Sequence, residues 1–102
     1  MALNHYLVDT VVVLLGTCEV VDPLTRVETL TNPTTVRFTR EQPDGTVTVY
    51  NTGDPEVVNL AVGIDACTVV ADQVGQEKWR YQGFGACATI SEDAFDVLES
   101  IL

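Results

Sequence analysis

The stretch TTVRFTREQPDGTVTVYN, from Thr34 to Asn51, decides the fold. Hydrophobic Val36 and Phe38 alternate with polar residues before the turn, and Val47 and Val49 do so after it. An alternation with a period of two is typical of a β-strand that buries one face. Between the two runs, the letters PDG favour a tight turn. The stretch therefore predicts a β-hairpin that places the valines and the phenylalanine on one buried face.

Further segments on both sides of the hairpin favour strands. The apolar run from Leu7 to Leu15 is rich in β-branched residues, and so are the runs 57–62 and 64–71. In the run 78–82, a tryptophan and a tyrosine alternate with polar residues, and large aromatic residues in such a strand usually anchor a core. The segment 24–33 fits an extra strand or an ordered loop.

The C-terminal segment fits two different structures. Ala94, Phe95, Leu98 and Ile101 have helical spacing, and Ser91 is a suitable N-cap. However, Phe95 also alternates with its neighbours as in a closing strand. On the residues alone, a helix is preferred.

The size and charge of the chain limit its function. With 102 residues and 46% hydrophobic residues, the chain is expected to form a single domain, residues 1–102, with its own core. It has 15 acidic and 5 basic residues, which give a net charge of −10. A phosphate backbone or an anionic membrane surface would repel such a chain, so we expect neither nucleic acid nor a membrane as its partner.

Three cysteines and one histidine are the residues of the chain with most reactive potential. Cys18, Cys67 and Cys87 form no CxxC motif and, with His5, do not match a zinc site. We interpret the cysteines as small buried hydrophobic residues in a reducing compartment, with one bridge and one free thiol as the alternative. The N-terminus lacks the basic region of a signal peptide, so we expect the chain to be cytoplasmic when it is made.

No motif in the chain indicates an active site. Nucleophile-elbow, zinc-protease, P-loop and dinucleotide-binding patterns are missing from the sequence. Acidic pairs at 54–56 and 92–93 lack the alternating ligand spacing of a calcium loop. We therefore expect a protein that is not an enzyme and has no cofactor or metal. An enzyme that uses Cys87 or His5 ranks last among the hypotheses.

Several segments, in their order along the chain, carry a family resemblance. They are DTVVVLLGTCEVVDP at 9–23, NPTTVRFTREQPDGTVTVY at 32–50, GDPEVV at 53–58, VGIDACTVVADQVGQEKWRYQGFG at 62–85 and FDV at 95–97. In this order they resemble the small immunoglobulin-like β-sandwich proteins encoded among the structural genes of tailed bacteriophages.

The resemblance implies an all-β fold, an immunoglobulin-like antiparallel β-sandwich of about seven strands. It favours a last strand through Phe95 and Val97, and we follow it over the helical spacing. The core between the sheets is expected to contain Val36, Phe38, Val47, Val49, Cys67, Val69, Trp79 and Tyr81.

The resemblance also implies a function. We expect a non-catalytic virion structural protein, most consistent with a head-associated capsid decoration protein, and a head–tail connector, neck or tail component is the alternative. Its partners would be the major capsid protein or other virion proteins, and it would act as a homo-oligomer or bound to a lattice. A hypothesis of a different class is a carbohydrate-binding or adhesion module that uses Tyr6, Tyr50 and Phe84.

Five residues are candidates for an interface with other subunits. Phe84 lies between two glycines, where an aromatic ring can be exposed. Val57 and Val58 lie on an expected edge strand without a protective charge, and the apolar N-terminal run has little such protection either. Ile101 and Leu102 form an apolar pair in the tail 99–102. The alternative is that this tail and the N-terminal segment 1–6 fold back on their own domain.

Overall fold

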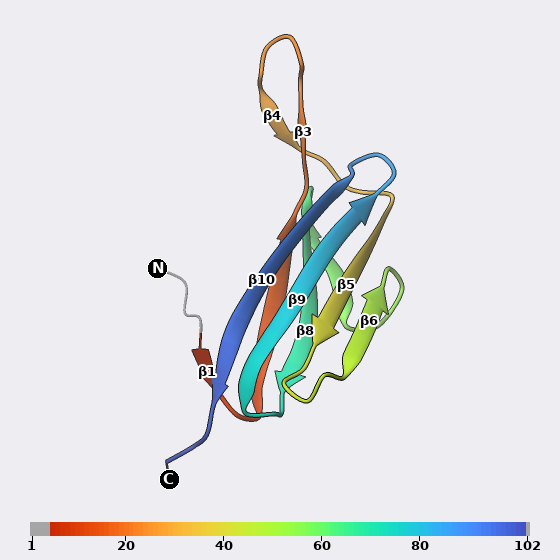
Figure 1. Ribbon diagram of the computed structural model, residues 1–102. Coiled ribbons are helices and arrows are strands. Elements are labelled where there is room, and N and C mark those ends of the chain that lie inside the picture. The colour runs from red at the N-terminus through yellow and green to blue at the C-terminus, as the bar shows by residue number, and fades with distance from the viewer. Residues whose placement is uncertain (1–4, 102) are drawn as a thin grey trace.

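The computed structural model describes residues 5–101, which form ten strands and no helix (Figure 1). In chain order, the strands are β1 (His5–Leu7), β2 (Thr10–Thr17), β3 (Glu19–Val21), β4 (Glu28–Leu30), β5 (Thr35–Glu41), β6 (Val47–Asn51), β7 (Val57–Ala61), β8 (Ile64–Ala71), β9 (Gly75–Phe84) and β10 (Thr89–Leu98). The predicted all-β fold is confirmed.

Two sheets packed face to face form the body of the molecule. The larger sheet has the order β1-β10-β9-β5-β6, and the smaller sheet has the order β2-β8-β7. All neighbouring strands are antiparallel except β1, which pairs parallel with β10. β3 and β4 form a separate hairpin that stands out from one end of the sandwich (Figure 1).

The core lies between the two sheets, as strand alternation predicts. The buried cluster consists of Val12, Leu14, Val36, Phe38, Cys67, Val69, Ala71, Tyr81, Phe95 and Val97. Five of the eight expected core residues are in this cluster. A sixth, Trp79, is half-buried, and its ring stacks on that of Phe38 with 6.4 Å between the ring centroids.

The prediction that Val47 and Val49 are buried is wrong. Their side chains are 57% and 45% exposed. The register of the hairpin pairs Phe38 with Tyr50 and Thr39 with Val49. Because paired residues share one face of a sheet, the buried Phe38 brings Tyr50 inward, and the two valines point outward. The turn between the two strands sets this register, and the alternation of residues within each strand does not reveal it.

The C-terminal segment is a strand, so the helix that its spacing favours does not form. Nine consecutive residues of β10 pair with β9, from Thr89 opposite Gly83 to Val97 opposite Gly75. Phe95 and Val97 point into the core. This long pairing with a neighbouring strand outweighs the local helical pattern.

The structure corrects the interpretation of the cysteines. Cys18, just after β2, forms a disulfide with Cys87 in the β9–β10 loop. Cys67 on β8 is a buried free cysteine. The expected set of three reduced thiols is therefore wrong, and the alternative of one bridge with one free thiol is confirmed. The bridge fastens the two sheets together at the end where the β3–β4 hairpin begins.

Candidate interaction surface

The two outward-facing surfaces of the sandwich differ in charge. The outer face of the larger sheet carries Arg37, Glu41, Lys78, Arg80 and Glu92 among its strand residues. Arg80 and Glu92 form an exposed ion pair at 2.9 Å. An open groove of about 420 Å³ crosses this face. This side of the molecule has the mixed, solvated character of an ordinary protein surface.

The outer face of the smaller sheet carries no charged strand residue. We call this surface the uncharged face, and it consists of Val11, Val13, Leu15, Thr17, Val58, Ile64, Ala66, Thr68 and Val70. Its four valines and Leu15 are each between 45% and 59% exposed. The charged residues Asp9, Glu56 and Asp72 lie beyond the strand ends. In a chain with 20 charged residues, a continuous surface of this kind is a candidate for contact with another molecule.

The β3–β4 hairpin, which we call the arm, is the second exposed feature. Every strand residue of the arm is exposed. At its tip, the N–H groups of Leu24 and Thr25 donate hydrogen bonds of 2.8 and 3.1 Å to Asp22 Oδ1. These bonds lower the pKa of Asp22, because they stabilise its carboxylate form. The Leu24 side chain is 91% exposed, so the arm presents an apolar tip to solvent.

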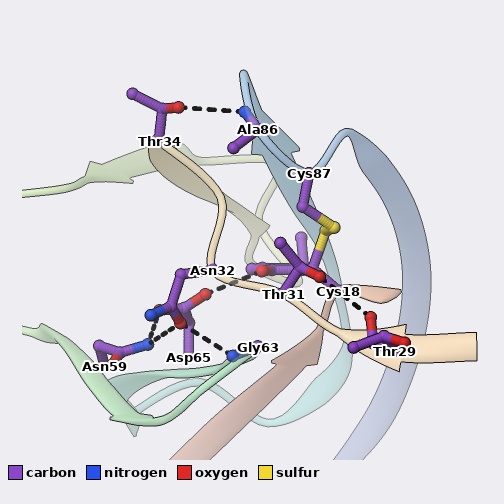
Figure 2. Close-up of a disulfide and its surroundings, with 11 residues drawn as sticks. Cys18, Thr29, Thr31, Asn32, Thr34, Asn59, Gly63, Asp65, Ala86 and Cys87 are labelled. Atoms are coloured by element: carbon purple, nitrogen blue, oxygen red, sulfur yellow. Dashed lines mark hydrogen bonds between the residues drawn. A yellow bond between two sulfur atoms is a disulfide. The ribbon is translucent and has the colours of Figure 1, made fainter. Parts of the chain in front are cut away.

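A network of bonds fixes the base of the arm to the sandwich (Figure 2). Beyond the Cys18–Cys87 disulfide, the Thr31 N–H donates a 3.0 Å hydrogen bond to the Cys18 carbonyl. The side-chain oxygen of Asn32 accepts bonds from the Gly63 N–H at 2.8 Å and from Asn59 Nδ2 at 3.1 Å. The arm therefore leaves the sandwich from a rigid base.

Buried polar groups inside the sandwich are paired with one another. The Tyr81 hydroxyl on β9 donates a 2.9 Å hydrogen bond to Asp65 Oδ2 on β8. Burial raises the pKa of Tyr81, and the bond to Asp65 raises it further. No buried side-chain nitrogen or oxygen within residues 5–101 lacks a hydrogen-bond partner. These groups serve the sandwich itself and leave no unpaired donor or acceptor for a ligand.

The cysteines are placed where they support the fold. Burial raises the pKa of the Cys67 thiol to about 12, so its nucleophilic thiolate is scarce at neutral pH. Cys87 is bonded to Cys18. His5 lies exposed on β1. In the part of the chain that the structure describes, no group of three or more histidine, cysteine, aspartate or glutamate residues is arranged to hold a metal ion.

The structure separates the five residues expected at an interface. Val58 lies on the uncharged face, whereas Val57 points inward and packs against the core. Phe84 is 37% exposed at the end of β9, with the Arg37 guanidinium 5.3 Å from its ring centre.

Two of the five lie in the tail. Ile101 is 97% exposed. Leu102 lies outside the described residues. Among the candidates within residues 5–101, only Val58 therefore belongs to the uncharged face.

The aromatic residues of the carbohydrate-binding hypothesis are also dispersed. The Tyr6 ring contacts Phe95 edge to face at 5.4 Å, and Arg40 Nη1 lies 3.5 Å from the Tyr50 hydroxyl. Both tyrosines are half-buried against the core. Only Phe84 of the three is exposed, so they form no common stacking platform.

Sequence reasoning identified the apolar N-terminal run as a poorly protected edge, but it did not assign Val11, Val13 and Leu15 to an outer face. Val11, Val13 and Leu15 belong to an apolar run that is typical of a strand covered on both faces. The signal that was available is the absence of charge over residues 10–17.

Comparison with known proteins adds no relative. No model of a protein family, no curated protein and no solved structure matches the chain. Within residues 5–101, no helix is present that could cross a bilayer.

Proposed function

We propose that this protein is a non-catalytic structural subunit that docks onto other protein subunits through its uncharged face. The observation that carries the proposal is the contrast between this face and the rest of an acidic chain. Exposed apolar side chains gain free energy when another surface removes them from water. Because the strand residues of this face carry no charge, a partner can cover them without removing a charged group from water.

The arm supports the same function. An isolated two-stranded hairpin is marginally stable in water, yet this one is held at its base by the disulfide and by Asn32. Its exposed apolar residues do not contribute to the buried cluster of the sandwich. A rigidly mounted hairpin with an apolar tip is suited to reach a neighbouring subunit.

The assembly that we propose is the virion of a tailed bacteriophage, in which the chain is a head-associated decoration protein. The sequence resemblance supports this assignment, and a small acidic module is suited to dock on a shell from outside. A position at the neck or on the tail is the alternative within the same class.

The order of the strands supports the immunoglobulin-like part of the proposal. In the fold that we propose, with the arm set aside and β1 as a short leading strand, β2, β8 and β7 would correspond to strands B, E and D. β10, β9 and β5 would then correspond to strands G, F and C. The Cys18–Cys87 bridge joins the regions just after the B-like and F-like strands.

Mass spectrometry of purified phage particles tests this function. The protein should be found in particles of the phage whose structural genes include it, and its copy number distinguishes the positions. Hundreds of copies indicate decoration of the head, and a copy number on the order of a symmetric ring indicates the neck. Absence of the protein from washed particles would contradict the proposal.

A further inference from the structure

β2 is the longest edge strand of the sandwich. The sheet orders place β1, β6, β2 and β7 at edges. β1 has three residues, β6 has five, and β7 has five with an irregular register between Asn59 and Ala61. β2 has eight residues and pairs with β8 through eight uninterrupted positions.

The free edge of β2 also lacks chemical protection. Edge strands usually carry charges, prolines or bulges that prevent another chain from pairing with them. The residues of β2 read TVVVLLGT, without a charge or a proline. Neither does the register with β8 contain a bulge. β2 is therefore open to pairing with a strand of another molecule.

The hydrogen bonds of the small sheet identify the backbone groups at this edge. The Cys18 N–H donates to the Gly63 carbonyl at 2.8 Å, just after β2. On the other side of β8, the Thr68 N–H donates to the Glu56 carbonyl at 3.0 Å. Because backbone groups in an antiparallel pair alternate between the two sides of a strand, even-numbered β2 residues bond to β8. Odd-numbered residues direct their N–H and C=O groups to the free edge, and these are Val11, Val13, Leu15 and Thr17.

We infer that the free edge of β2 pairs antiparallel with β2 of a second copy of this chain. A twofold axis beside Leu14 sets Val11 opposite Thr17, and Val13 opposite Leu15, of the other copy. Every residue in these pairs directs its backbone groups to the free edge. The two small sheets then join in the order β7-β8-β2-β2-β8-β7.

The strand is self-complementary because this register pairs odd-numbered residues with odd-numbered residues. Paired residues lie on the same side of a sheet. Odd residues pair with odd residues, so the uncharged faces of both copies lie on the same side. The pairing therefore doubles the width of the uncharged face, measured across the strands, and leaves it open for a further partner.

The charge distribution favours this edge over the others for a second copy. Two chains with a net charge of −10 repel each other, so their contact is favoured where charges are fewest. Residues 10–17 carry none. Since salt screens the remaining repulsion, added salt should strengthen this association.

Sedimentation equilibrium of the oxidised protein tests the inference, from micromolar to millimolar concentration. The mass should rise from that of one chain, 11.1 kDa, toward twice this value, and more readily at higher salt. Amide hydrogen exchange followed by NMR gives a residue-level readout. The amides of Val11, Val13 and Leu15 should gain protection as the concentration rises, whereas those of Val12 and Leu14 should be protected throughout. A monomer at all concentrations would overturn the inference.

Two variants separate edge pairing from contact through the face. Val13→Pro removes an N–H that faces the free edge and leaves the bonds to β8 in place, so it should abolish the dimer. Val70→Lys places a charge on the uncharged face, away from the edge, and should retain the dimer. Dimers that persist in Val13→Pro, or that disappear in Val70→Lys, would contradict edge pairing. If Val13→Pro fails to fold, the exchange pattern of the unmodified chain decides.

These experiments are independent of the proposed function. A chain that docks on particles without forming a β2 dimer overturns this inference and leaves the proposed function standing. A chain that forms the β2 dimer but is absent from particles overturns the proposed function and leaves this inference standing.

Discussion

Arg40 and Glu77 form an ion pair inside the sandwich, with two hydrogen bonds between the guanidinium and the carboxylate. Arg40 Nη2 lies 2.7 Å from Glu77 Oε1, and Nε lies 3.1 Å from Oε2. Nη2 also donates a 2.7 Å bond to the carbonyl of Val70 on the opposite sheet. The pairing of β7 with β8 ends at Val57 opposite Cys67, and the Val70 carbonyl lies beyond this end. The arginine therefore supplies the hydrogen bond that β7 does not give to this carbonyl. The pair thus connects the two sheets.

Replacement of Arg40 by leucine should destabilise the protein strongly. The variant leaves the buried Glu77 carboxylate and the Val70 carbonyl without their main partner, which typically costs about 3–5 kcal/mol. Urea denaturation gives the free energy of unfolding. The double variant R40L/E77L removes both charges and should be markedly more stable than R40L alone. A single variant within about 1 kcal/mol of the unmodified protein would show that the pair is not buried in solution.

Gly16 is required because the Tyr81 ring occupies the space beside it. A Cβ atom at position 16 would overlap the Cδ1 and Cγ atoms of the Tyr81 ring. Gly16→Ala should therefore cost about 1–3 kcal/mol of stability through overpacking. The double variant G16A/Y81L should lose less stability than the sum of the losses of the two single variants, because leucine leaves room for the added methyl group. Thr17→Ala, on the exposed side, is the control and should change stability by less than about 0.5 kcal/mol.

The Gly16 contact illustrates which parts of the fold the sequence could predict. The apolar alternation around Val36, Phe38 and Tyr81 correctly indicated strands and a sandwich core, because period-two burial is a local property. Gly16 pairs with Asp65 in a regular register, so neither a bulge nor a turn accounts for the glycine. A glycine that makes room for a distant ring leaves no local signal, and neither does the turn-dependent register that exposes Val47 and Val49.

The Cys18–Cys87 disulfide should contribute substantially to stability. It links residues 69 positions apart, and constraint of so long a loop in the unfolded chain is worth about 4 kcal/mol in the entropic model. Dithiothreitol should lower the urea midpoint of the native protein. The double variant C18S/C87S should start at a lower midpoint and show no further change with the reductant. Equal midpoints with and without reductant in the unmodified chain would contradict the bridge.

Cys67 should be inert in the folded protein. Its side chain is buried, and its pKa is raised to about 12, so the thiolate is neither exposed nor populated near pH 8. A chromogenic disulfide reagent should detect no thiol in the native protein, one thiol after urea unfolding, and three after unfolding with prior reduction. Rapid reaction of a native thiol would show that Cys67 is accessible or that the bridge is open.

The candidate surface was less predictable than the fold. Val58 was identified because its strand was expected at an edge and carries no charge that would protect that edge. The rest of the uncharged face could not be found in this way, because a valine that packs in a core and a valine that faces a partner look the same in a sequence. Only the structure, in which Val12 is buried while Val11 and Val13 are exposed, shows that these two valines point away from the core.

The occupancy of particles by face variants tests the central claim, docking through the uncharged face, most directly. Particles that lack the native protein are incubated with the unmodified chain, with Val70→Lys, or with Gln82→Lys, which adds the same charge to the outer face of the larger sheet. Bound protein is then quantified by mass spectrometry. We expect Gln82→Lys to bind as the unmodified chain does and Val70→Lys to be lost from the particles although it remains folded. Equal binding of both variants would contradict docking through the uncharged face.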